Sequence, residues 1–241
     1  MKTLAFVLLS FAAGCTSGGD DDRPIVTNPG QPPATGGTGA NVTRGRVCVG
    51  SDLRDLGNCS SIGAGGIAVS LGDNSTVTAA DGTFTLPLPD TTLDEFIVSG
   101  TSTNGVSIVP TTSAFTTSAT IPAIDAELYQ SILLANGITS ADGTGSVLVN
   151  VTRADLAASG VTVSSTPSGA GTLYAGSSSM VWNGTGTGES GTVLIPGITA
   201  GSVDLSYQTI LGGLETQVNG VTVRNGGVTI LSTQLPGSGT P

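Results

Sequence analysis

GIAVSLGDNSTVTAADGTFTLPLP, residues 66–89, is the stretch that decides the fold. Apolar and polar residues alternate along 66–71 and 83–88, as they do in strands with one buried face. The dipeptide Asp81-Gly82 between two such runs is typical of a tight turn. The stretch therefore predicts short antiparallel strands joined by turns.

The same alternation continues on both sides of this stretch. Further short runs lie at 45–49, 75–79, 96–99 and 106–109. Strands at intervals of about ten residues, with turn residues between them, are typical of a β-sandwich. We therefore predict a first antiparallel sandwich over residues 44–121.

The pattern is then repeated in the second half of the chain. Three pairs of segments match in the same order: 45–49 with 145–149, 66–70 with 160–164, and 81–87 with 190–196. Ordered matches of this kind indicate a duplicated domain. We predict a second sandwich over 139–236, with its last strands at 203–207, 216–223 and 228–235, and a tail at 237–241.

One segment between the two predicted sandwiches departs from the strand rhythm. Apolar residues recur at helical spacing through 124–135, Asp125 can serve the first turn, and Asn136-Gly137 is typical of a helix end. We expect one short helix within a connection over 122–138. The fold class predicted is thus all-β: two tandem antiparallel sandwiches with one short helix between them.

The N-terminus reads as an export signal. Lys2 is followed by an apolar run over 4–13 and then by Gly14. A basic start, a short apolar segment and small residues before a break are typical of a signal peptide. The apolar run is too short to span a bilayer, which needs about 20 helical residues. We therefore predict a signal peptide over 1–14.

Ala12-Ala13-Gly14-Cys15 resembles the lipobox of bacterial lipoproteins, although Ala12 stands where that family usually has Leu. The resemblance implies that Cys15 becomes the first mature residue and carries a diacylglyceryl thioether and an acylated amino group. Several buried acyl chains hold a protein firmly at a bilayer. Thr16 follows the cysteine, which favours the outer membrane. The alternative is cleavage near Ala13, with Cys15 left as a free thiol.

Residues 15–43 are rich in Pro, Gly and Asp and predict a disordered tether. Removal of 1–14 also removes the single lysine of the chain, so six arginines remain against seventeen acids, a net charge of −11. This charge argues against nucleic acid as a partner and against direct attraction to an anionic membrane surface. The expected membrane contact is the lipid on Cys15.

Cys48 and Cys59 remain as an even pair if Cys15 is acylated. In an oxidising compartment such a pair is expected to form a disulfide, which would contribute about 2–3 kcal/mol by restricting the unfolded chain. The alternative is two free thiols.

The mature chain has no histidine and no lysine. It therefore lacks the commonest general base, the commonest metal ligand and any Schiff-base nucleophile. We expect no enzyme activity, no cofactor and no metal, although a glycosidase-like pair of carboxylates remains formally open. Asp73, Asp81 and Asp142 could offer oxygen ligands to calcium, but ordinary turns explain them better.

Tyr174 and Trp182 are the candidate ligand contacts, in a Gly/Ser-rich stretch over 169–191. An exposed aromatic pair on a sandwich loop would form a carbohydrate-binding patch. The alternative, which we favour, is that Trp182 fills the core of the second sandwich.

Each copy carries, in this order, G-x-V-x-V, then G-[IV]-x-V-[ST], and then a Gly turn followed by an apolar strand that ends in Pro. This order of motifs resembles the carboxypeptidase regulatory-like domain. Its most specific part lies at 81–86; in the second copy Ser190 and Val193 replace the Asp and the aromatic residue. The resemblance implies a prealbumin-like (transthyretin-like) seven-stranded sandwich with an accessory role.

These observations predict a lipid-anchored protein of the cell envelope, at the outer membrane, on its periplasmic face or at the cell surface. Its two modules would serve structural or protein-binding roles without catalysis, with an envelope protein or a polysaccharide as partner. The alternative is a carbohydrate-binding accessory lipoprotein, since starch-binding-like modules share this architecture.

Overall fold

The computed structural model describes residues 42–57, 60, 64–88, 95–114, 118–209 and 213–236. All of these belong to one compact unit, 39–241. The predicted signal peptide, Cys15, most of the predicted tether and the predicted tail lie outside the described residues.

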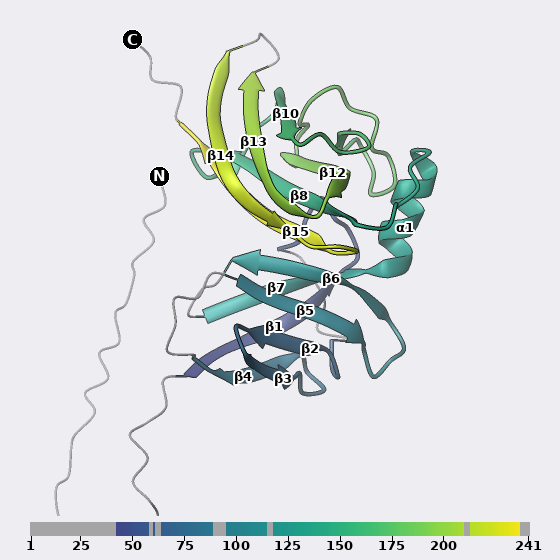
Figure 1. Cartoon of the computed structure of the whole chain (residues 1–241), viewed down its shortest axis with the longest axis vertical. Helices are drawn as coiled ribbons and strands as arrows, with labels where there is room; N and C mark the ends of the chain where they lie inside the picture. The colour runs from purple at the N-terminus through teal and green to yellow at the C-terminus, as the bar shows by residue number, and fades with distance from the viewer. Residues whose placement is uncertain are drawn as a thin grey trace, which may run out of the picture. The chain divides into compact units, whose positions relative to one another are not determined.

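The described residues are mostly β-strand with one helix, which confirms the predicted all-β class (Figure 1). We call the strands before the helix the first lobe. They are β1 (Val42–Gly50), β2 (Ala68–Leu71), β3 (Asn74–Val77), β4 (Thr83–Pro87), β5 (Glu95–Thr101), β6 (Ser107–Ala114) and β7 (Ser118–Asp125).

Helix α1 (Ala126–Ala135) follows β7, and we call the strands after it the second lobe. They are β8 (Thr144–Arg153), β9 (Leu156–Ala157), β10 (Val161–Thr166), β11 (Leu173–Tyr174), β12 (Thr192–Thr199), β13 (Gly201–Thr209), β14 (Leu214–Val223) and β15 (Val228–Leu235).

Each lobe encloses its own apolar core. In the first lobe, buried residues of β1, β4 and β7 pack against those of β2, β5 and β6, and the rings of Phe84 and Phe96 meet edge to face at 5.8 Å. In the second lobe, β8 and β12 pack against β10, β13 and β14 around Tyr207, which is fully buried. The alternating apolar residues of the strands thus fill both cores, as the period-two pattern predicts.

The strand pairing differs from the prediction in one respect: it is not entirely antiparallel. The first strand of each lobe pairs in parallel with the last strand of that lobe, β1 with β7 and β8 with β15. A third parallel pairing joins Val228–Ile230 of β15 to Thr111–Ser113 of β6. Parallel partners lie far apart in sequence, so the local turn signals could not reveal them.

Both lobes contain the same buried threonine bridge. In the first lobe, Thr78 Oγ1 donates to the Ala64 carbonyl at 2.5 Å and accepts from the Ile67 amide at 2.9 Å. Its counterpart in the second lobe is Thr187, whose Oγ1 donates to the Ala158 carbonyl at 2.6 Å and accepts from the Val161 amide at 3.0 Å. In both lobes the two partner residues are three positions apart in the sequence. Each bridge ties a loop to the start of a strand without leaving a buried polar group unpaired.

Helix α1 begins two residues later than predicted because Asp125 acts as its N-cap. The Asp125 carboxylate accepts a hydrogen bond from the Glu127 amide at 2.8 Å. Its end is as predicted: Asn136 is the C-cap and Gly137 has φ +68°. In the described part of the chain, no helix is long and apolar enough to cross a membrane.

Two predicted boundaries fall inside observed strands. Strand β1 begins at Val42, within the predicted tether, and β7 continues to Asp125, past the predicted limit of the first sandwich at residue 121. The sequence did not indicate that β7 continues through Pro122, because proline is depleted in strands.

Candidate functional site

Several carboxylates of the described residues have structural partners. Asp52 pairs with Arg54, Glu95 pairs with Arg224, and Asp81 accepts hydrogen bonds from the amide and hydroxyl of its own turn residue Thr83. Within the described ranges, no group of three or more His, Cys, Asp and Glu side chains is placed to hold a metal ion.

Tyr174 and Trp182 are buried and belong to different clusters. Trp182 is 2% exposed and donates from Nε1 to the Ser179 carbonyl at 2.9 Å, while Tyr174 is 7% exposed. Tyr174 packs in the core of the second lobe, and Trp182 packs where the lobes meet. Burial removes the basis for an exposed aromatic patch. The core role favoured for Trp182 is the observed one, although its core is shared by both lobes.

The hydroxyl of Tyr174 closes a sheet edge. It accepts from the Val163 amide at 2.8 Å and lies 3.2 Å from the Val163 carbonyl, on the side of β10 that lacks a strand partner. Burial raises the pKa of Tyr174, so the hydroxyl keeps its proton. In the first lobe, strand β3 pairs with β2 at the corresponding edge. Tyr174 thus satisfies backbone groups that would otherwise be open to another strand.

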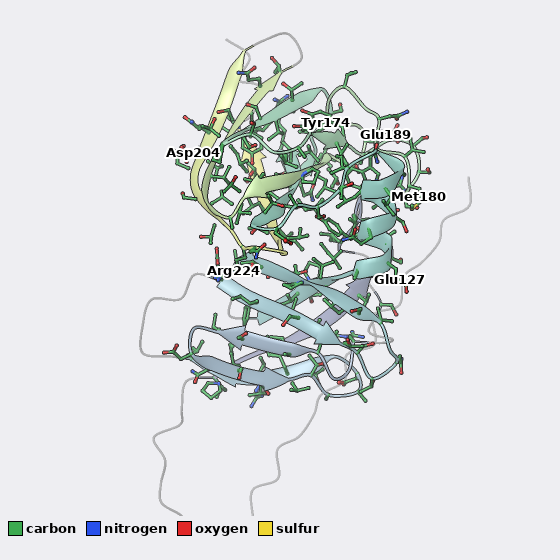
Figure 2. All side chains as sticks on the ribbon, turned by 45° about the vertical axis from the view of Figure 1, so that its right-hand side comes forward. Glu127, Tyr174, Met180, Glu189, Asp204 and Arg224 are labelled. Atoms are coloured by element: carbon green, nitrogen blue, oxygen red, sulfur yellow. The ribbon has the colours of Figure 1, made fainter. Side chains whose placement is uncertain are left out.

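The main candidate site is the junction of the two lobes, where a third buried cluster lies. We call this cluster the junction core; it holds residues of both lobes and of α1: Leu53, Val109, Ile124, Tyr129, Ile132, Leu133, Leu148, Leu173, Ala175, Trp182, Leu194 and Val228. Strands β8 and β12 are consequently buried on both faces. The ion pair of Arg224 with Glu95, at 3.2 Å, adds a polar contact between lobes (Figure 2).

One loop of the first lobe reaches onto the second lobe. We call residues 51–57 the strap. Leu53, at its centre, is 1% exposed within the junction core. The Arg54 carbonyl accepts from Thr192 Oγ1 at 3.2 Å, and Arg54 Nη1 donates to the Gly176 carbonyl at 3.4 Å. The strap therefore makes apolar and polar contacts with the second lobe.

An ion pair between Asp52 and Arg54 holds the Arg54 side chain in place within the strap. Arg54 Nη2 lies 2.6 Å from Asp52 Oδ2, and Arg54 Nε donates to both Asp52 oxygens. These hydrogen bonds hold the pKa of the Asp52 carboxyl below its ordinary value. The guanidinium is thereby fixed in the direction from which it reaches Gly176.

Two hollows open beside the junction. One of about 310 Å³ is lined by α1 and neighbouring turns, and its Tyr129 hydroxyl lies 2.6 Å from Ser146 Oγ. A second, of about 720 Å³, lies between the strap and the second lobe and includes Asp55 and Glu189. The ion pair of Asp52 with Arg54 also lines the second hollow.

The predicted cysteine sites are only partly visible. Cys15 and Cys59 lie outside the described residues, and Cys48 is buried in β1. The backbone of Val49, beside Cys48, exchanges two hydrogen bonds with Ser60, the residue after Cys59. The disulfide stays a prediction, and this pairing brings the two cysteine-bearing segments together.

Leu53 and Arg54 are the junction residues that sequence reasoning missed. Leu53 and Leu56 are the only large apolar residues of a short polar loop, too few to establish a strand or helix period. The only sequence feature that marked these two residues is their position between Cys48 and Cys59.

The chain matches no family model and no curated protein. Among solved structures, it is similar to the minor pilin GBS52 of Streptococcus agalactiae, at 15% identity over 83% of this chain and 98% of that one, with a TM-score of 0.27. The shaft pilin spaA of Lactobacillus rhamnosus GG gives 9% identity over 83% and 98%, with a TM-score of 0.23. The Gamma-CGTASE of alkalophilic Bacillus clarkii gives 17% over 74% and 24%, with a TM-score of 0.19. The carboxypeptidase regulatory-like resemblance stays a prediction.

Proposed function

We propose that this chain is a lipid-anchored protein of the cell envelope that presents one packed β body for structural or protein-binding roles, without catalysis. Acyl chains on Cys15 hold it at the outer membrane, and a disulfide joins Cys48 to Cys59. Its partner is an envelope protein or a polysaccharide, and nucleic acid is no partner because the mature chain is strongly acidic.

The junction core carries the presentation part of this proposal. Lobes joined only by a flexible linker would bring a bound partner to no defined position. Here Leu53, Trp182 and the helix residue Ile132 share one buried cluster, and β6 pairs with β15 across the junction. Such packing keeps the loops of one lobe in a fixed orientation to those of the other, which suits a structural or binding module.

The N-terminal sequence supports the anchoring part. A flexible chain as long as residues 16–41 has a root-mean-square span of about 25–30 Å. The acyl chains on Cys15 would therefore keep the packed body within a few tens of ångströms of the bilayer. The length of the tether limits how far the body lies from the bilayer, and the surface of the body determines which partner it binds.

Replacing Cys15 by serine is expected to release the protein from the membrane, because serine offers no thiol for the thioether. In fractionated cells, the parent should sediment with the membranes and enter the detergent phase of a Triton X-114 separation. The Cys15→Ser variant should remain in the aqueous phase. Cys48→Ser, which removes a cysteine of β1, is the matched control and should still sediment. Parent protein in the aqueous phase would contradict the proposal.

No observation favours the carbohydrate-binding alternative as a second function. It was predicted from the architecture shared with starch-binding-like modules, and its candidate contacts, Tyr174 and Trp182, are both buried.

A further inference from the structure

Two arginines lie side by side on the outer face of the sheet formed by β4, β1 and β7. Alternate residues of β1 point toward the core of the first lobe, and Arg44 and Arg46 belong to the set that points outward and are exposed. In the strand register, Arg46 lies opposite Thr83 of β4 and Thr120 of β7, and Arg44 lies opposite Thr85 of β4. We call these five exposed residues the arginine face.

The other arginines of the described residues are already engaged. Arg54 and Arg224 form ion pairs, and Arg153 has an interaction of its own. Within the described part of the chain, neither Arg44 nor Arg46 forms an ion pair. Two positive charges on neighbouring outward positions of one strand repel each other, and an anion placed between them would relieve that repulsion.

The carboxylate of Asp81 adjoins this face but serves its own turn. It accepts hydrogen bonds from the Thr83 amide at 3.0 Å and from the Thr83 hydroxyl at 2.7 Å. These hydrogen bonds, and less strongly the charge of Arg46, hold the pKa of the Asp81 carboxyl below its ordinary value. The two arginines outnumber this one carboxylate, so the face keeps an excess of positive charge.

The arginine face differs in charge from the body as a whole. The net charge argues against attraction of the whole body to an anionic surface, but salt screens charges within about 8 Å under physiological conditions. The charges close to a contact therefore decide whether that contact forms. Strand β4 and the start of β1 lie at the end of the first lobe away from the second lobe, so the acids of the second lobe are remote from this face (Figure 1).

The arginine face also lies where the chain enters the body. Strand β1 is the first described element, and its first residue, Val42, is exposed on the same side of the strand as Arg44. The residues before β1 are those of the predicted tether from Cys15. Of the surfaces of the body, this one is thus joined to the anchor by the shortest length of chain.

We propose that the arginine face is the membrane-facing side of the anchored body, where Arg44 and Arg46 contact headgroup phosphates of the bilayer that holds Cys15. This inference deepens the proposed function and rests on it for the lipid anchor. Guanidinium groups donate paired hydrogen bonds to phosphate oxygens, and the hydroxyls of Thr85 and Thr120 are further donors. The acyl chains supply the attachment and the arginines supply the orientation. The second lobe then points away from the bilayer, toward a partner.

The test measures how fast each arginine of the full, lipidated protein reacts with p-hydroxyphenylglyoxal, by mass spectrometry of its peptides. The protein is placed in vesicles of phosphatidylcholine alone or of equal parts phosphatidylcholine and phosphatidylglycerol. Arg44 and Arg46 are expected to react about threefold or more slowly in the anionic vesicles. This protection should disappear in about 1 M sodium chloride, which shortens the screening length to about 3 Å. Arg224, which is paired with Glu95, is the internal reference and should react equally in both vesicles.

Two variants with the same change of net charge separate a local contact from a general charge effect. Arg44→Gln should reduce the protection of Arg46 by about twofold or more, because half of the contact is lost. Arg224→Gln is the matched control and should leave the protection of Arg46 as in the parent. Equal effects of the two variants would show that net charge, and not the arginine face, governs the contact.

Flotation of the vesicles distinguishes failure of this inference from failure of the proposed function. Protein that floats with the vesicles, but whose Arg44 and Arg46 react equally in both lipids, would overturn the orientation and leave the anchored function standing. Protein that does not float would contradict both. Protection that follows the protein density and not the lipid charge would assign the face to contacts between copies. Equal protection by inorganic phosphate in phosphatidylcholine vesicles would assign it to a small anion, and either result would overturn the inference.

Discussion

Replacement of Gly82 by alanine is expected to destabilise the protein by about 3–5 kcal/mol, which is a large part of the stability of a domain. Gly82 has φ +81°, a conformation that strains any residue with a Cβ atom. An added Cβ would also overlap the Val47 carbonyl oxygen and lie 2.9 Å from the Ala64 Cβ. That carbonyl belongs to β1, so the backbone cannot yield without disturbing the core of the first lobe.

Gly105→Ala is the matched control for this prediction. Gly105 has φ +83°, but nothing lies within 4 Å of an added Cβ. It should therefore lose only about 1 kcal/mol, from backbone strain. Urea denaturation followed by circular dichroism compares the two variants. Equal transition midpoints would show that the close approach of residue 82 to the Val47 carbonyl does not affect the stability. Gly191, whose Cβ would overlap the Val151 carbonyl, should behave as Gly82 does.

Removal of the Trp182 side chain is expected to cost about 3–5 kcal/mol, as truncation of a buried aromatic residue does. The indole lies in the junction core, so its loss leaves a cavity between the lobes and frees the Ser179 carbonyl. The Trp182→Ala variant should show a lower midpoint in urea, or two separate transitions where the parent shows one. Binding to polysaccharide columns should be the same as for the parent.

Met180→Ala controls for effects of the loop itself. Met180 lies two residues away and is 41% exposed, so its truncation should cost well under 1 kcal/mol. If Trp182→Ala kept the parental midpoint and lost retention on a polysaccharide, Trp182 would be a ligand contact and not a core residue.

The sequence predicted those features of the fold that depend on residues close together in the chain. Alternation of apolar residues placed the strands, because one face of each must be buried. The Asp81-Gly82 turn could be read because few residues other than glycine tolerate its positive φ. The end of α1 was signalled by Asn136-Gly137 for the same reason.

The junction could not be read from the sequence, because it depends on contacts between distant residues. Leu53 contributes to the junction core from a loop with no periodic pattern, and β15 pairs with β6 over more than a hundred residues. The threonine bridges were not predicted, although the sequence holds a signal for them. Thr78 and Thr187 stand at equal distances from Gly82 and Gly191, so a closer alignment of the two copies could have found them.

The most direct test of the account is mass spectrometry of the N-terminus of the mature protein purified from membranes. We expect a chain that begins at Cys15 and whose N-terminal peptide is heavier by a diacylglyceryl group and an amide-linked acyl chain. A mature chain that starts at another residue, or that carries an unmodified Cys15 and is recovered in the aqueous fraction, would contradict it.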